Sequence, residues 1–263
     1  MVMPNLRHWL VALVGRTLNV TIVRAGAVGP LFERDHLKLF FASFGVDCVF
    51  DVGANEGQYA QMLRRFGYAG PIVSFEPIPS AAMNLRAKAK HDPLWFIEEV
   101  ALDEAERRVS FNVMRNSQFS SLLAPSTEDT GKFIEMNAVA YSVELVTREL
   151  SSFYDVYKAK LGFTHPFLKM DTQGNDLSVA RGAGSRLQYF VGLQSEMAVK
   201  KLYDRAVDYR AALAFYLDQD FEISAFVPNN RGHFPALIEF DCIMYNVNRF
   251  QTSVAVLPVT VES

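Results

Sequence analysis

The stretch VFDVGANEGQYA, residues 49–60, decides how the fold of this chain is interpreted. Its first part is apolar apart from one acid, which is typical of a buried strand. Gly53 and Gly57 bracket Asn55 directly afterwards, and a helical pattern over 57–67 follows. Glycine lets a backbone turn tightly and approach a ligand closely. The stretch therefore predicts a strand, a tight turn against a ligand, and a helix.

Apolar runs with strand composition alternate with helical patterns along the rest of the chain. Strands are predicted at 48–52, 72–76, 94–102, 108–113, 139–147, 166–171, 189–196, 221–227 and 236–245, and helices at 57–67, 79–90 and 199–218. This alternation favours an α/β fold with a parallel sheet covered by helices on both faces. The connection between the last two runs is too short for a crossover helix, so those strands are expected to pair antiparallel.

The composition is that of an ordinary globular protein. Of the 263 residues, 50% are hydrophobic and 21% are charged, and the net charge of −3 gives no basis for nucleic-acid binding. Cys48 and Cys242 lie in apolar runs and suggest buried thiols in a reducing cytoplasm, not disulfides or a zinc site.

The N-terminal segment has an apolar patch from Trp9 to Val14, flanked by Arg7 and Arg16. The patch is too short to span a bilayer. Two interpretations stay open: a helix that packs on the domain, or a helix that lies on the inner face of a membrane with Trp9 at the interface. The second interpretation predicts a peripheral contact between the protein and the membrane.

The glycine-rich turn differs from the usual phosphate-binding turns. Its spacing is G-x-N-x-G, so it lacks both the G-x-G-x-x-G dinucleotide pattern and the Lys-Ser/Thr of a P-loop. Asp51 puts a carboxylate beside the ligand, and Glu76 ends the second predicted strand, where an acid suits the two hydroxyls of a ribose. An adenosine ligand with positive charge fits this pattern, and S-adenosylmethionine (SAM) is such a ligand.

Six blocks of sequence resemble the FkbM family of SAM-dependent methyltransferases. In order, they are VFDVGANEGQYA, IVSFEPIPSA, EVALDE, FLKMDTQGND, GLQSEMAVKKLY and FDCIMYN. The resemblance runs from about Phe32 to Asn246. It implies a Rossmann-like, seven-stranded methyltransferase sheet with an antiparallel last strand, and O-methylation, commonly of sugar hydroxyls. We expect residues 1–45 to form a helical extension and residues 46–263 to form the methyltransferase domain.

The resemblance also implies positions for the cofactor. Around the methionine part it places Asp51, Gly53, Ala54, Asn55 and Gly57. On the ribose and near the adenine it places Glu76 and Pro77, and Glu99 and Ala101, respectively. The family often has Asn where this chain has Glu99. Ser120 and Ser121 are expected near the cofactor carboxylate or the mouth of the substrate site.

The fourth block departs from the family pattern D-x-E-G-x-E. Asp171 and Gly174 match the pattern, but Gln173 and Asp176 stand where the family usually has acids. These replacements weaken any mechanism that needs three carboxylates in this block.

Methylation of a hydroxyl requires a base at the carboxyl edge of the sheet, and three residues are candidates. Asp171 and Glu196 end the fourth and fifth parallel strands, and His233, whose ordinary pKa suits neutral pH, lies in the loop after the sixth. Asp171 could instead cap the next turn, Glu196 could bind substrate hydroxyls, and His233 could be simply solvated. Asp171, Glu196 and Asp241 could also share one Mg²⁺, a cation that prefers oxygen ligands.

The leading hypothesis is a SAM-dependent O-methyltransferase that acts on a sugar of a glycolipid, a polysaccharide or a glycosylated natural product. Its partner would be a glycan or glycolipid acceptor and not a nucleic acid. Methylation of a soluble polyketide or macrolide hydroxyl is an alternative, and so is a non-catalytic protein that binds the cofactor.

Overall fold

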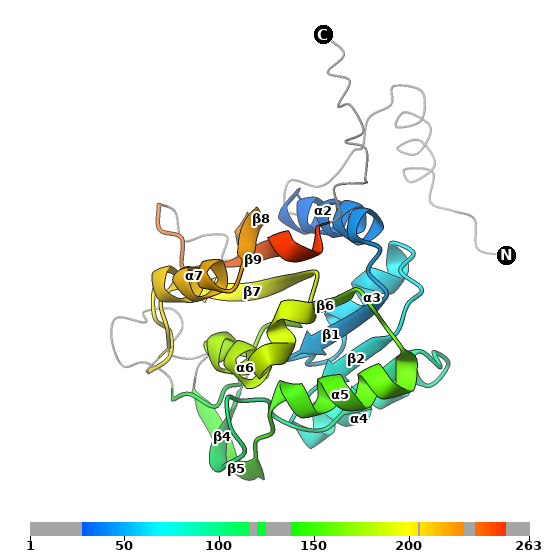
Figure 1. Cartoon of the computed structure of the whole chain (residues 1–263). Helices are drawn as coiled ribbons and strands as arrows, with labels where there is room; N and C mark the ends of the chain where they lie inside the picture. The colour runs from blue at the N-terminus through cyan, green and yellow to red at the C-terminus, as the bar shows by residue number, and fades with distance from the viewer. Residues whose placement is uncertain (1–27, 116–119, 125–137, 205, 229–234, 251–263) are drawn as a thin grey trace, which may run out of the picture.

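A computed structural model describes residues 28–115, 120–124, 138–204, 206–228 and 235–250 (Figure 1). Its centre is a seven-stranded sheet with the order β3-β2-β1-β6-β7-β9-β8. The strands are β1 (Cys48–Val52), β2 (Ile72–Phe75), β3 (Trp95–Glu98), β6 (Pro166–Met170), β7 (Gly192–Ala198), β8 (Phe221–Pro228) and β9 (Glu239–Asn246). Strand β9 is antiparallel to β7 and β8, whereas β3, β2, β1, β6 and β7 are parallel. The predicted seven-stranded sheet with its antiparallel last strand is confirmed.

Helices cover both faces of this sheet. They are α2 (Val28–Phe44), α3 (Gln58–Arg65), α4 (Pro79–Ala89), α5 (Leu150–Leu161), α6 (Asp176–Gly182) and α7 (Tyr209–Asp218). Buried residues of α2, α3 and α4 share one apolar cluster with the sheet, and buried residues of α5, α6 and α7 share another. The central strands β1 and β6 are buried along their whole length, which explains their continuous apolar sequences.

Strands β4 (Arg108–Met114) and β5 (Val139–Val146) form a separate antiparallel pair. Both segments alternate in sequence, and the sequence predicted 108–113 as an arm or extension. Phe111 and Val113 of β4 pack against Ile78 and Ala81, at the start of α4. The pair therefore sits beside the ends of the central strands, next to the candidate site.

The predicted helix at 199–218 is too long. Only α7 is helical in this stretch, and it begins after Asp208, whose carboxylate accepts hydrogen bonds from the backbone N–H groups of Arg210 and Ala211. Upstream, Leu202 and Tyr203 are buried in a small separate cluster with Met114. Leu202 and Tyr203 therefore serve a different packing site, and the described residues between β7 and Asp208 form no helix.

The N-terminal helix α2 is packed into the domain. Leu37, Phe40 and Phe41 are buried in the cluster under the sheet, and the ring of Phe40 contacts that of Phe167 at a centroid distance of 5.4 Å. Residues 1–27, with the predicted Trp9 segment, lie outside the described residues, and the division at residue 45 stays a prediction. In the part of the chain that is described, no helix combines the length and the apolar character needed to span a membrane.

Candidate active site

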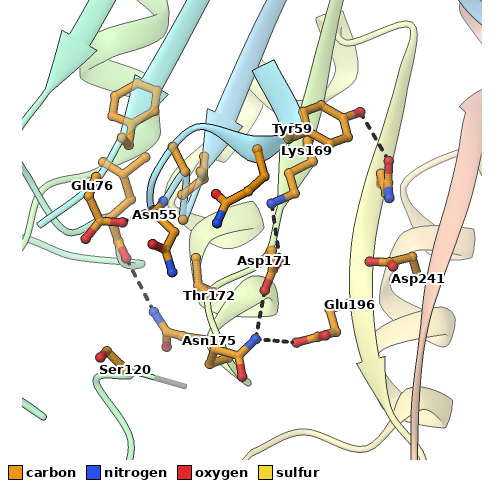
Figure 2. A pocket seen from close by; sticks show the side chains of 18 of the residues that line it. Asn55, Tyr59, Glu76, Ser120, Lys169, Asp171, Thr172, Asn175, Glu196 and Asp241 are labelled. Carbon is orange, nitrogen blue, oxygen red and sulfur yellow. Dashed lines mark hydrogen bonds and ion pairs between the residues drawn. The ribbon is translucent and has the colours of Figure 1, made fainter. Parts of the chain in front are cut away.

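A cavity of about 870 Å³ lies along the carboxyl ends of the parallel strands (Figure 2). This is the edge where open α/β sheets bind ligands. One half of the cavity is lined by the turns after β1, β2 and β3, and by Phe111, Ser120 and Leu122. The other half is lined by residues of α2 and α3 and by the ends of β7 and β9. Lys169 and Asp171 lie where the two halves meet.

The glycine-rich turn forms the floor of the first half. Gly53, Asn55 and Gly57 have φ values of 75°, 47° and 81°, in the left-handed region. A side chain at Gly53 would collide with the backbone carbonyl of Asp171, so only glycine lets the turn pack against the end of β6. Gly57 has a different role. A Cβ there would lie 2.8 Å from atoms of Leu85 and Trp95, so this glycine permits packing and does not line the cavity.

Glu76 stands at the end of β2 and lines the cavity although it is only 5% exposed. Its two oxygens accept hydrogen bonds from the backbone N–H groups of Asn55 (2.8 Å) and Ile78 (2.9 Å). Burial raises the pKa of Glu76 to about 7, and the two backbone hydrogen bonds oppose this shift. Each carboxylate oxygen can accept a second hydrogen bond, so the group remains able to bind a diol.

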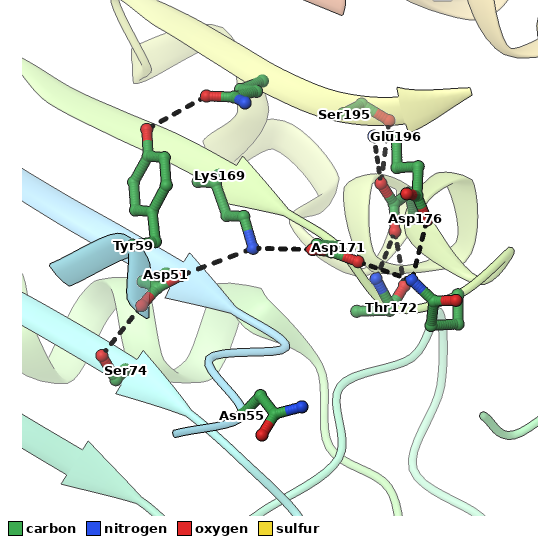
Figure 3. Close-up of polar contacts among 12 residues, drawn as sticks. Asp51, Asn55, Tyr59, Ser74, Lys169, Asp171, Thr172, Asp176, Ser195 and Glu196 are labelled. Atoms are coloured by element: carbon green, nitrogen blue, oxygen red, sulfur yellow. Dashed lines mark hydrogen bonds and ion pairs between the residues drawn. The ribbon is translucent and has the colours of Figure 1, made fainter. Parts of the chain in front are cut away.

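A buried chain of charges connects the turn to the end of β6 (Figure 3). The Nζ atom of Lys169 lies 3.7 Å from Asp51 Oδ1 and 3.4 Å from Asp171 Oδ2. Asp51 also accepts a hydrogen bond from Ser74 and is fully buried beneath the turn, outside the cavity lining. Asp51 thus forms an ion pair with Lys169 and does not line the cavity, whereas Lys169 does, and the contact between Asp51 and the methionine part stays a prediction.

The amide of Gln173 links Asp171 to Glu196. Its nitrogen donates to Asp171 Oδ1 (2.8 Å) and to Glu196 Oε2 (2.9 Å), and its oxygen accepts from the hydroxyl of Tyr203 (2.9 Å). The backbone at Gln173 has φ 55°, which points the side chain back toward both carboxylates. Gln173 therefore orients the two candidate bases instead of acting as an acid itself.

Asp176 is a second supporting residue, and it is buried at the start of α6. One oxygen accepts from the backbone and hydroxyl of Thr172 (2.8 and 2.6 Å), and the other accepts from Ser195 Oγ and the backbone of Glu196 (3.1 and 2.8 Å). These bonds join the turn after β6 to the end of β7. Asp176 thereby fixes the spacing of the elements that carry Asp171 and Glu196.

The other predicted residues have three outcomes: some line the cavity, two do not, and one lies outside the described residues. Ala54, Pro77, Ala101, Ser120 and Asp241 line the cavity. Glu99 does not, because it points outward and pairs with Arg86 at 2.7 Å. Ser121 is buried behind the lining, where its hydroxyl donates to the backbone oxygen of Gln173. His233 lies outside the described residues.

The geometry gives no support to a metal ion on Asp171, Glu196 and Asp241. Among the described residues, no three His, Cys, Asp or Glu side chains are grouped so that they could hold a metal. The Gln173 amide, a hydrogen-bond donor, stands between the oxygens of Asp171 and Glu196. A cation bound by both carboxylates would have to displace it.

The residues present fit the predicted cofactor. The buried side-chain oxygen of Asn55 has no hydrogen-bond partner within the described part of the chain, although Asn55 lines the cavity. An acceptor left unpaired in this way suits an ammonium group. Together with Glu76, it gives the first half of the cavity acceptors for an ammonium and for ribose hydroxyls, which are the donors that SAM presents.

The sequence interpretation missed Lys169, Gln173 and Asp176 as site residues. A lysine inside an otherwise apolar strand was the available indication for Lys169, because lysine is almost never buried without a charged partner. Gln173 and Asp176 were noted only as departures from a family pattern. Their contacts depend on how β6, β7 and α6 meet in space.

Comparison with known proteins identifies the family. The model of the methyltransferase FkbM domain matches residues 51–223, more than half of the chain. No curated protein matches the chain.

Several solved structures have a similar fold at low sequence identity. Fibrillarin from Aeropyrum pernix, solved with natively bound SAM, is 12% identical over 75% of this chain and 66% of its own, with a TM-score of 0.41. An rRNA methylase from Streptococcus thermophilus is 10% identical over 82% of this chain and 94% of its own, with a TM-score of 0.41. Precorrin-6y C5,15-methyltransferase from Geobacter metallireducens is 11% identical over 81% of this chain and 86% of its own, with a TM-score of 0.39.

These structural likenesses are weak, so the family assignment rests on the domain match and on the sheet order. The chain belongs to the FkbM family and is a SAM-dependent methyltransferase.

Proposed function

We propose that this methyltransferase transfers the methyl group of SAM to a hydroxyl of a sugar, on a glycolipid, a polysaccharide or a glycosylated natural product. The observation that carries the proposal is the pair of carboxylates Asp171 and Glu196, held by one amide at the junction of the two cavity halves. A hydroxyl acceptor needs a group that removes its proton. The pair of carboxylates lies beside the first half of the cavity, which contains Glu76 and Asn55.

Glu196 is the base in this proposal. Burial and then the carboxylates of Asp171, Glu239 and Asp241 raise the pKa of Glu196 well above its ordinary value. A carboxylate with a raised pKa takes a proton more readily as the new bond forms. Asp171 is held by Lys169 as well as by Gln173, so it is better suited to orient the acceptor hydroxyl.

SAM, when bound, supplies a methyl group that its sulfonium already activates. The task left to the protein is alignment of the hydroxyl and removal of its proton, and alignment alone contributes much of the rate. The second half of the cavity supports a sugar acceptor. Its lining includes Glu33, Gln194, Glu239 and Asp241, side chains with the oxygen and nitrogen atoms that bind sugar hydroxyls.

A transfer assay with labelled SAM tests the acceptor class. Three pools are offered separately: extracted glycolipids, polysaccharide fragments, and soluble macrolactone alcohols. We expect label in a sugar of the first or second pool, at an ether that resists mild base, located by mass spectrometry of the hydrolysed product. Label confined to the macrolactone pool would support the alternative acceptor, and label lost in mild base would indicate a methyl ester and exclude the proposal.

Two variants and a chelation experiment accompany this assay. Glu196→Gln should abolish most of the transfer, whereas Glu144→Gln, at an exposed site on β5 away from the cavity, should leave it unchanged. Activity that persists after chelation would support catalysis without a metal ion. Activity lost on chelation and restored by Mg²⁺ would favour the metal site predicted on Asp171, Glu196 and Asp241.

A further inference from the structure

The methionine part of SAM carries a carboxylate, and this cavity is rich in acids. Any favourable contact for that carboxylate must come from a cationic side chain or from hydrogen-bond donors. Within the described residues, the cationic side chains of the lining are Arg34, Arg65 and Lys169. Arg34 and Arg65 are exposed on α2 and α3, in the half away from the glycine-rich turn, and Arg34 pairs with Asp35 at 2.7 Å.

Lys169 is placed differently from the two arginines. It is buried on β6, next to Asp51 of β1 in the sheet register, directly beneath the turn that carries Gly53 and Asn55. Figure 3 shows its ammonium between Asp51 and Asp171, and Lys169 belongs to the cavity lining. Tyr59 covers it from α3, with the ring centroid 5.3 Å from Nζ. The cation is therefore fixed in position before any ligand binds.

The contacts of this ammonium leave part of its hydrogen-bonding capacity unused. Its distances to Asp51 and Asp171 are 3.7 and 3.4 Å. Charge-assisted hydrogen bonds between nitrogen and carboxylate usually measure about 2.7–2.9 Å. An ammonium has three N–H donors, and neither carboxylate holds one of them at the usual length. A third anion at the cavity floor could therefore be bound without breaking a strong contact.

The charge of Lys169 is also secure. Burial lowers the pKa of Lys169, but the carboxylates of Asp171, Asp51, Asp241 and Asp176 outweigh burial and hold it above its ordinary value. The side chain thus stays cationic throughout the physiological range.

The residues expected from the sequence to meet the cofactor carboxylate are less well placed. The Ser121 hydroxyl has a single proton, and it donates that proton to the backbone oxygen of Gln173. Ser120 does line the cavity, but its oxygen accepts from the backbone N–H of Met114 and it carries no charge.

From these contacts we propose that the Lys169 ammonium binds the carboxylate of the methionine part of SAM. The proposal rests on the cofactor assignment and is independent of the acceptor. It makes Lys169 a cofactor-binding residue, held in place by Asp51 and Asp171.

A binding cycle tests this assignment without any acceptor. SAM and its decarboxylated analogue are titrated calorimetrically into the wild-type protein and into Lys169→Met. In the wild type, we expect loss of the ligand carboxylate to weaken binding on the order of 30-fold, as for a charge-assisted hydrogen bond. In Lys169→Met the same change in the ligand should alter the affinity by less than about threefold, because the partner is gone. Lys90→Met, at an exposed site on the surface, is the matched control and should behave like the wild type.

Removing Lys169 leaves Asp51 as a buried charge without its ion pair, so the single variant could fail to fold. The double variant Lys169→Met/Asp51→Asn removes both charges and serves as the second test. Lys169→Arg keeps the cation and should retain part of the preference for the carboxylate. If loss of the ligand carboxylate weakened binding equally in the wild type and in a folded variant with Met at position 169, single or double, the proposal would be overturned. Failure of the wild type to bind either ligand would overturn the cofactor assignment itself, whatever the transfer assay shows.

Discussion

At the scale of single residues, Glu76 makes cofactor affinity depend on pH. The carboxylate accepts hydrogen bonds from ribose hydroxyls best when it is ionised, and burial raises its pKa to about 7. Affinity is therefore present above this pKa and is lost as the pH falls through it. We expect calorimetric titration to show binding about tenfold weaker at pH 6 than at pH 8, because only about a tenth of the Glu76 side chains are ionised at pH 6.

The amino group of SAM also titrates near pH 8, so the probe for this experiment should lack it. 5′-Methylthioadenosine keeps the ribose and has no group that ionises between pH 6 and 8. Glu76→Gln should bind this probe more weakly at pH 8, and its affinity should be nearly independent of pH. A pH slope that survives in Glu76→Gln would assign the titration to another group.

The role of Glu196 can be separated from cofactor binding. Glu196→Gln preserves the size of the side chain and can keep a hydrogen bond with Gln173, but it can no longer accept a proton. We expect kcat to fall by about 10²–10⁴ and the affinity for SAM to change by less than about threefold. Steady-state transfer rates and calorimetry measure the two quantities. A loss of SAM affinity as large as the loss of kcat would place Glu196 in cofactor binding instead.

At the scale of secondary-structure elements, helix α2 should contribute strongly to stability through one buried stripe. Phe40 stacks on Phe44 at 4.3 Å and contacts Phe167, whereas its neighbour Leu39 is 69% exposed. Phe40→Ala should lower the free energy of unfolding by about 3–5 kcal/mol, because it leaves a cavity in the core. Leu39→Ala should change it by less than about 0.5 kcal/mol. Urea denaturation of the two variants measures the difference, and equal effects would show that α2 is not held by this stripe.

The strands were predictable because the central ones are buried on both faces and read as apolar runs. The strand predicted at 94–102 is too long, because only β3 within it is a strand. Val100, Ala101 and Leu102 follow β3 outside any strand and line the cavity. Helix α5 was missed although Leu150, Tyr154 and Tyr157 recur at helical spacing. This spacing is a helix signal that the sequence carries.

The site was predictable mainly where a residue lies at or near the carboxyl end of a parallel strand. Glu76 and Asp171 directly follow β2 and β6, Glu196 lies near the end of β7, and all three line the cavity. The bridging amide of Gln173 depends on a left-handed turn and on a neighbouring strand, neither of which sequence spacing reveals. Supporting contacts between separate strands are properties of the assembled sheet.

At the scale of the whole molecule, the buried acids of the site lower the stability of the folded protein when they ionise. Burial raises the pKa of Asp51, Asp176 and Glu196, as well as that of Glu76. A group whose pKa is raised on folding binds more protons in the folded state than in the unfolded state, so stability falls as the pH rises through that interval. The pKa of His36 is lowered by burial, so this group makes stability rise with pH, mainly below its ordinary pKa of 6.5. A comparison that starts at pH 6.5 keeps this opposing contribution small.

Thermal unfolding of the cofactor-free protein at pH 6.5 and 8.5 tests this balance. With a folded pKa of about 7 against an ordinary 4.5, Glu76 alone should remove about 1 kcal/mol of stability across this interval, and the other acids act in the same direction. We expect Tm to be about 2–4 °C lower at pH 8.5. Saturating 5′-methylthioadenosine should raise Tm at both values, and by more at pH 8.5, because the ionised Glu76 binds the ribose more tightly. A Tm that rises with pH, or a ligand shift that is larger at pH 6.5, would show that partners neutralise the buried acids and that these acids do not lower stability.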